Sequence, residues 1–180
     1  MPDEKVVYKD AITNILDANK GRLTPRIRER MKAEAGVDDA ALKPTYPIPA
    51  HDLVVKILGQ ELFPGRTPDD ATYEVGRAML NSYGRGVLGK ALFSLIRLMG
   101  PMRILKRVPE YYKMSNNYAD VKIEIIDQKS YVLDHNEVGS VPHFWRGAMQ
   151  GSGEVIGLAG HAVELLSYDG ARARFRVSWS

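Results

Sequence analysis

The sequence predicts an α+β fold in which N-terminal helices pack on a small C-terminal antiparallel sheet. Apolar and polar residues alternate without a break from Ala171 to Trp179, and successive side chains of a strand point to opposite faces. Helix starts are marked earlier, at Thr24-Pro25 and Thr67-Pro68, where threonine can cap the helix and proline suits its first position. Strand patterns begin only after Asn117, so we expect the helices to precede the sheet.

The first helices are separated by prolines and glycines. We expect one helix from Pro25 to about Gly36. Three prolines between Lys43 and Pro49 predict an extended connector, and the helix that follows it stops at Pro64-Gly65. The helix that starts at Thr67 has two carboxylates in its first turn, where the positive end of the helix dipole favours them.

The segment Val87–Met99 predicts a helix that is apolar on nearly all sides. Three polar residues form a thin seam along it: Lys90, Ser94 and Arg97. Such a helix is either central to the core or buried in a subunit interface. We expect a homodimer through this helix, with Phe93 and Leu98 in the interface; the alternative is burial by the N-terminal helices. Gly100-Pro101 then separates it from a helix over Met102 to about Met114.

The remaining chain predicts two hairpins separated by a helix from about Pro142 to Leu158. The four expected strands are Val121–Ile125, Tyr131–Asp134, Val163–Leu166 and Arg172–Trp179, with a turn at Asp169-Gly170 before the last. We expect one domain over residues 1–180, with a helical part over about 8–115 and a sheet part over about 118–180.

Composition excludes several classes of protein. The chain has 180 residues, 44% of them hydrophobic, which suffices for one domain with a core. Its net charge of +3 is diffuse rather than concentrated, so we expect no nucleic-acid partner. The lack of cysteine excludes disulfides, thiolate metal sites and a cysteine nucleophile. No signal region or apolar run of membrane-spanning length is present, so we expect a cytoplasmic protein without a membrane span.

A glycine motif, Gly84-Arg85-Gly86-Val87-Leu88-Gly89, matches the dinucleotide-binding pattern G-x-G-x-x-G. That chemistry requires a strand before the first glycine. Here the preceding residues, Ala78 to Tyr83, read as a helix. Close helix packing or a kink between two helices explains the glycines better.

The histidines give weak evidence for an active site. His51, His135, His143 and His161 do not form a recognisable set of metal ligands, since zinc takes three or four ligands at matched spacings. We expect no metal site. His135 and Glu137 lie two residues apart at a strand end and share a face, so they are the one pair suited to acid–base chemistry. No other catalytic residue is indicated, and a non-enzymatic protein is favoured.

The last strand also places three arginines in a row: Arg172, Arg174 and Arg176. The row could bind an anion. The alternative is a solvated sheet face that is balanced by Glu124 and Glu164, with an edge strand protected by charge.

Several short motifs carry a resemblance to a known family. They are Gly100-Pro101-Met102-Arg103-Ile104-Leu105, Ser115-Asn116-Asn117-Tyr118, Phe144-Trp145-Arg146-Gly147 with Gly151, and Phe175-Arg176-Val177-Ser178-Trp179. From about Ala11 to Trp179 the chain resembles an uncharacterised domain family that is expanded into many paralogues in myxobacteria.

The last third is also similar to a superfamily of vinyl-reductase-type ligand domains, haem nitric-oxide-binding domains and TRAPP trafficking subunits. This resemblance implies helices on a small sheet, a small-molecule or acyl pocket between them, and dimerisation through helices. The chain lacks the Tyr-x-Ser-x-Arg element of the haem branch, and Tyr83-Gly84-Arg85 is no equivalent, so we expect no haem. The residues indicate no other cofactor.

We therefore expect a non-enzymatic small-molecule-binding or signalling module. Its apolar pocket would lie between the Val87–Met99 helix and the inner sheet face. The candidate ligand-binding residues are Tyr112, His143, Trp145, Phe175 and Trp179. The alternatives are a TRAPP-like interaction or scaffold subunit without a ligand and, third, an enzyme that uses His135 and Glu137.

Overall fold

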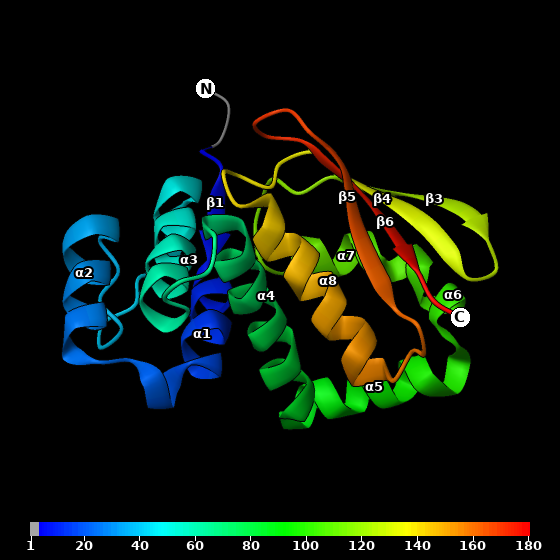
Figure 1. Cartoon of the computed structure of the whole chain (residues 1–180), viewed down its shortest axis with the longest axis horizontal. Coiled ribbons are helices and arrows are strands. Elements are labelled where there is room, and N and C mark those ends of the chain that lie inside the picture. Colours follow the sequence, from blue (N-terminus) through cyan, green and yellow to red (C-terminus); the bar gives the residue numbers. More distant parts are fainter. Residues whose placement is uncertain (1–3) are drawn as a thin grey trace.

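Helices come first along the chain and a small antiparallel sheet comes last, which confirms the predicted α+β fold (Figure 1). The computed structural model describes residues 4–180. Its helices are α1 (Lys9–Ala18), α2 (Pro25–Ala35), α3 (Ile48–Leu62), α4 (Pro68–Arg85), α5 (Val87–Met99), α6 (Pro101–Ile104), α7 (Val108–Lys113) and α8 (Pro142–Ile156). Its strands are β1 (Val6–Tyr8), β2 (Thr45–Pro47), β3 (Val121–Asp127), β4 (Ser130–His135), β5 (Ala162–Tyr168) and β6 (Ala173–Ser178).

The predicted helix starts are confirmed by their capping contacts. The Thr24 hydroxyl accepts a hydrogen bond from the Ile27 backbone N–H at 3.3 Å. The Thr67 hydroxyl accepts one from the Asp70 N–H at 3.2 Å. Each contact satisfies a backbone donor that the first turn of a helix leaves unpaired.

The four-stranded sheet has the order β3-β4-β6-β5, and every neighbouring pair is antiparallel. The two hairpins and the helix between them match the prediction. On β6 the residues Ala173, Phe175 and Val177 are buried, as the alternation predicts. Helix α8 lies beside this sheet and packs tightly against α4, so it joins the sheet to the helical part (Figure 1).

A second, two-stranded sheet of β1 and β2 was not predicted as such, although β2 lies within the predicted extended connector. The backbone N–H of Tyr8 donates to the Ser115 carbonyl at 2.8 Å. This contact ties the N-terminal strand to the segment that leads into the large sheet.

The predicted helix over residues 102–114 is divided into α6, a 3-10 turn at Leu105–Arg107 and α7. Pro109 is the physical reason, because proline has no N–H and its ring clashes with the carbonyl four residues earlier. It therefore fits only near the start of a new helix, where α7 has it.

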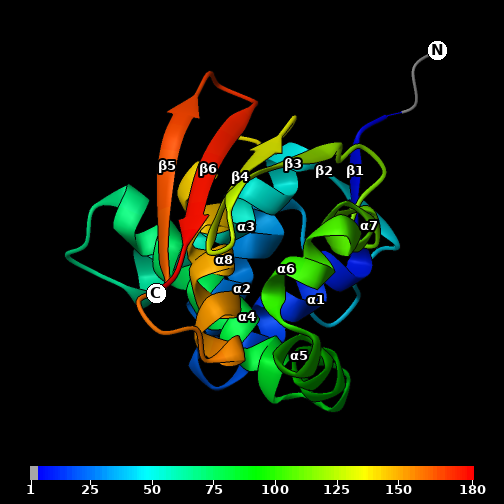
Figure 2. The same ribbon diagram turned by 90° about the vertical axis from the view of Figure 1, so that its right-hand side faces the viewer.

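The position of α5 corrects one prediction. Its buried residues Phe93 and Ile96 pack with side chains of α4, α7 and α8, and among the described residues no sheet residue belongs to this apolar cluster. Helix α5 follows the lower edge of the molecule in both views (Figures 1 and 2). The prediction that α5 forms one wall of a pocket against the inner sheet face is therefore wrong.

The packing interpretation of the glycine motif is confirmed. Gly84 lies on α4, where a Cβ would meet the Val155 side chain of α8 at 2.5 Å. Gly86 separates α4 from α5. A Cβ on Gly89 would lie 2.0 Å from the Tyr83 carbonyl oxygen, so the two helices approach too closely for a side chain there.

The apolar packing forms one large cluster in the helical part and two smaller ones, at the sheet and under α5. Within residues 4–180, none of the helices has the length and hydropathy needed to cross a bilayer.

Candidate functional site

His135, the last residue of β4, is fully buried. Its Nδ1 accepts a hydrogen bond from the Glu137 backbone N–H at 3.1 Å, so the proton of the neutral ring lies on Nε2. Within residues 4–180 that Nε2–H has no hydrogen-bond partner. Burial lowers the pKa of His135 to about 4, which keeps the ring neutral near pH 7. A buried donor without a partner is costly, and this one marks the site.

Aromatic rings surround this imidazole. The Tyr112 ring of α7 meets it edge to face, with ring centroids 5.0 Å apart. The Trp145 ring of α8 lies 5.1 Å from it and stacks on Tyr112 at 5.5 Å. These three residues are here named the aromatic cluster. Tyr112 and Trp145 are half-buried, so each keeps part of its surface in contact with solvent.

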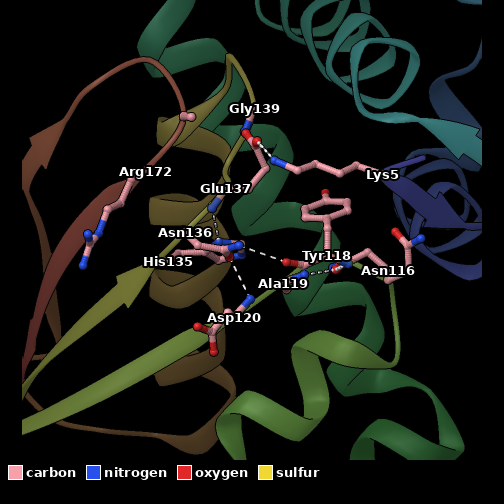
Figure 3. A network of polar contacts seen from close by, with 12 residues as sticks. Lys5, Asn116, Tyr118, Ala119, Asp120, His135, Asn136, Glu137, Gly139 and Arg172 are labelled. Atoms are coloured by element: carbon pink, nitrogen blue, oxygen red, sulfur yellow. Dashed lines mark hydrogen bonds and ion pairs between the residues drawn. The ribbon is translucent and has the colours of Figure 1, made fainter. Parts of the chain in front are cut away.

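The residues after β4 are held in place by polar contacts (Figure 3). The Asn136 side chain accepts from the Asp120 N–H at 2.7 Å and donates to the Tyr118 carbonyl at 2.9 Å. The Val138 carbonyl accepts from the Trp145 indole N–H at 3.2 Å. The loop thereby fixes both His135 and Trp145.

A second set of polar contacts holds the end of the same loop. The buried Asp52 carboxylate of α3 accepts from the Ser140 N–H at 2.6 Å and from its hydroxyl at 2.9 Å. The Ser140 hydroxyl also accepts from the Lys56 ammonium at 2.7 Å. The Asp52 carboxylate thereby clamps a loop that lies 88 residues away in the sequence.

Two of the five predicted ligand-binding residues meet in the aromatic cluster, namely Tyr112 and Trp145. Phe175 is fully buried in the apolar cluster that both of them border. His143 lies apart, with its Nε2 3.4 Å from an Asp69 carboxylate oxygen. Trp179 also lies apart, against Tyr131 on the sheet, with ring centroids 6.3 Å apart.

Sequence reasoning missed the part that His135 plays in this cluster, although a signal was present. His135 follows Leu133 by two residues, so both side chains share one face of β4. That face pairs with the apolar face of β6, where Leu133 lies opposite Phe175 and His135 opposite Ala173. Period-two counting therefore predicts an imidazole among apolar neighbours.

The structure does not assemble His135 and Glu137 as an acid–base pair. The Glu137 carboxylate accepts from the Lys5 ammonium at 2.9 Å and from the Gly139 N–H at 3.2 Å (Figure 3). Its contact with the imidazole runs through the backbone N–H alone. Among the described residues, 4–180, no three histidine or carboxylate side chains gather as a possible metal site.

The arginine row faces carboxylates on the outer side of the sheet. Arg172 pairs with Asp134 at 2.5 Å. Arg174 pairs with Glu124 at 3.2 Å and with Asp134 at 4.0 Å, and Arg176 pairs with Glu164 at 3.8 Å. These pairs favour the charge-balanced sheet face over an anion site.

A cavity of about 120 Å³ lies beside α3, away from the aromatic cluster. Lys56, Thr72, Ser140 and Pro142 are among its lining residues. The Ser140 hydroxyl contacts both Lys56 and Asp52. The polar wall of the cavity therefore belongs to the contacts between Asp52 and Ser140, here named the loop clamp.

Buried His135 predicts a loss of stability in mild acid. Its folded pKa of about 4 lies below the ordinary histidine value of about 6.5, so the unfolded chain binds more protons between these values. We expect the free energy of unfolding to fall by about 2 kcal/mol from this residue between pH 7 and pH 5. Urea unfolding at both pH values measures it, and His135→Gln should remove this part of the slope. An unchanged slope in the variant would contradict the prediction.

Solved structures of H-NOX proteins share this fold. A mutant H-NOX protein from K. algicida, described as Fe(II) unliganded, aligns with a TM-score of 0.69 at 14% identity, over 96% of both chains. A doubly substituted Tt H-NOX aligns with a TM-score of 0.70 at 12% identity, over 96% of this chain and 95% of its own. A T. Tengcongensis H-NOX mutant aligns with a TM-score of 0.65 at 14% identity, over 95% of this chain and 96% of its own. These likenesses establish the fold.

No curated protein sequence matches the chain. One family model does, that of a protein of unknown function (DUF2378), and the match runs over residues 5–180. Because this match covers nearly the whole chain, the protein belongs to the DUF2378 family.

Proposed function

We propose that this protein is a non-enzymatic small-molecule-binding or signalling module whose ligand contacts the aromatic cluster. The observation that carries the proposal is the buried Nε2–H of His135, which lacks a partner within residues 4–180. A ligand oxygen that accepts this hydrogen bond would remove the cost of burying it. The fold supports the proposal, because a solved H-NOX protein with this fold is described as Fe(II) unliganded, which is a statement about its ligand state.

The cluster suits a small, flat, apolar molecule with one acceptor oxygen. Tyr112 and Trp145 are half-buried, so stacking of a ligand on the solvent-accessible part of either ring would bury the ligand's apolar part. Burial raises the pKa of the Tyr112 hydroxyl, so this side chain stays neutral beside an apolar ligand.

Haem does not fit this arrangement. An imidazole binds haem iron through a nitrogen lone pair. In His135 the Nδ1 lone pair accepts the Glu137 N–H, and Nε2 carries the proton. The expectation that the chain holds no haem therefore stands as part of the proposal.

Tryptophan fluorescence tests the proposal, because the chain has two tryptophans and Trp179 lies outside the cluster. In a Trp179→Phe variant, Trp145 is the sole reporter. We expect saturable quenching by 1,4-naphthoquinone, which has carbonyl acceptors, and weaker binding of naphthalene, which has none. The chain has no cysteine thiol that the quinone could modify.

His135→Phe supplies the matched control for this experiment. It keeps an aromatic ring but removes the donor, so the preference for naphthoquinone over naphthalene should disappear. Equal binding of both compounds by the parent variant, or no saturable quenching by either, refutes the proposed site.

The alternative function, an interaction subunit without a ligand, is favoured by a different observation. Helix α5 exposes large apolar side chains at the surface, among them Leu98 at 84% exposure. Phe93, the other predicted interface residue, is buried within the subunit at 5% exposure, so it is unsuited to a direct dimer contact.

A further inference from the structure

The outer face of α5 exposes large apolar side chains to solvent. Among the described side chains of this helix, four large apolar ones are exposed: Val87, Leu95, Leu98 and Met99. Val87 is 91% exposed and Leu98 84%. The two lie eleven residues apart, which is close to three helical turns, so they share one side of the helix. The four exposed side chains are here named the α5 stripe. Helix α5 follows the lower edge of the molecule in both views, with no other element beneath it (Figures 1 and 2).

The chain around the stripe is strongly basic. Residues 85–107 include six basic side chains and no carboxylate, whereas the whole chain has a net charge of only +3. The six are exposed: Arg85, Lys90, Arg97, Arg103, Lys106 and Arg107. The Arg97 guanidinium donates to the Ile156 carbonyl at the end of α8 at 3.1 Å. Across residues 4–180 no ion pair involves any of the six, so their charge is not balanced by a neighbouring carboxylate there.

We infer that the α5 face docks on an anionic lipid surface. An exposed helix with an apolar stripe and basic neighbours lies in the plane of a membrane interface, with its apolar side chains among the acyl chains. Each basic residue near such a surface adds attraction to anionic headgroups. Because α5 lies at the edge of the molecule, the stripe can contact the surface of a lipid bilayer.

Charge disfavours a second copy of this chain as the occupant. A two-fold dimer through α5 would bring the same helix from each subunit together. Six basic side chains of one copy would then lie near six of the other, without carboxylates from residues 85–107 to balance them. Like charges at an interface oppose association. The positive charge therefore selects an anionic partner over a self-complementary one.

Vesicle co-sedimentation with the full-length protein tests the inference. We expect binding to phosphatidylcholine vesicles that contain about one third phosphatidylserine, and little binding to pure phosphatidylcholine. Binding should weaken strongly between about 0.1 M and about 0.5 M salt, since salt screens exposed charges. The double variant Lys106→Gln/Arg107→Gln should bind about 30-fold more weakly, and Leu98→Gln about tenfold more weakly.

Two matched variants control for general effects. Ile126→Gln removes an apolar side chain that is 52% exposed on β3, and Lys129→Gln removes an exposed charge in the β3–β4 turn. Both should change vesicle binding by less than about twofold. Circular dichroism confirms that each variant is folded.

Three outcomes would overturn the inference. The first is equal binding to charged and neutral vesicles, and the second is no binding to either. The third is a dimer in light scattering, instead of the 20.1 kDa chain, that Leu98→Gln converts to a monomer; this result would assign the stripe to a second copy.

Discussion

Replacing Gly147 by alanine should lower the free energy of unfolding by about 3 kcal/mol or more. Gly147 lies on α8 where this helix crosses α4, and a Cβ there would lie 1.9 Å from the Tyr73 carbonyl oxygen. Both groups belong to backbones of packed helices, so neither can rotate away. The helices would have to separate, which disrupts the packing between the helical part and the sheet part.

Helix propensity works in the opposite direction at this position and does not rescue the variant. Alanine is favoured over glycine inside a helix by about 1 kcal/mol. The overpacking cost exceeds this gain because the obstacle is a backbone carbonyl rather than a flexible side chain. Chemical denaturation measures the difference, and the larger Gly147→Leu should give no folded protein.

Gly21→Ala is the matched control for this prediction. A Cβ on Gly21 would meet no atom within 4 Å. Its substitution should change the free energy of unfolding by less than about 1 kcal/mol. A Gly147→Ala variant that is as stable as Gly21→Ala would show that α4 and α8 separate at little cost.

The features that sequence reasoning predicted are those that local patterns determine. A threonine before proline fixes a helix start through one side chain and the next few backbone amides, as Thr24 shows. Strict alternation assigns each β6 side chain to a face, and Phe175 is accordingly buried. The glycines near residue 84 were interpreted correctly because the preceding helix excluded a nucleotide-binding turn.

The features that sequence reasoning did not predict depend on contacts between distant segments. The apolar character of α5 indicated that the helix is buried in the core or in a subunit interface. It did not show which side of the helix faces the rest of the protein. In the structure Phe93 faces inward and Leu98 outward. The three residues of β1 are too few for a recognisable period. The role of Asp52 depends on Ser140, far away in the sequence.

In the candidate site, too, some features follow from local sequence patterns and others from contacts between distant segments. Trp145 and Tyr112 were selected as ligand-binding residues of the expected pocket, and the structure brings them together at 5.5 Å. His143 was selected for the same role but occupies another side of α8, because two residues correspond to about 200° of helix rotation. The unpartnered Nε2 of His135 depends on a backbone hydrogen bond to Nδ1, which no spacing pattern reveals.

Asp52→Ala should lower the free energy of unfolding by about 3 kcal/mol. The carboxylate accepts two hydrogen bonds from Ser140, at 2.6 and 2.9 Å, and lies 3.2 Å from the His51 Nδ1. Alanine would leave the Ser140 N–H and hydroxyl without this acceptor and the buried His51 ring without its carboxylate neighbour. Because the released loop includes Val138, whose carbonyl holds the Trp145 indole, the fluorescence of Trp145 should shift as well.

Asp10→Ala separates the loop clamp from a simple helix-dipole role for Asp52. Asp10 is an exposed carboxylate in the first turn of α1, where it acts on the dipole alone, so its loss should cost less than about 1 kcal/mol. Urea unfolding of the two variants, with Trp179→Phe as background so that Trp145 reports alone, compares them directly. If both variants lose the same stability and the Trp145 emission is unshifted in Asp52→Ala, Asp52 acts on the helix dipole alone. The loop clamp instead requires a larger loss of stability in Asp52→Ala together with a shifted emission.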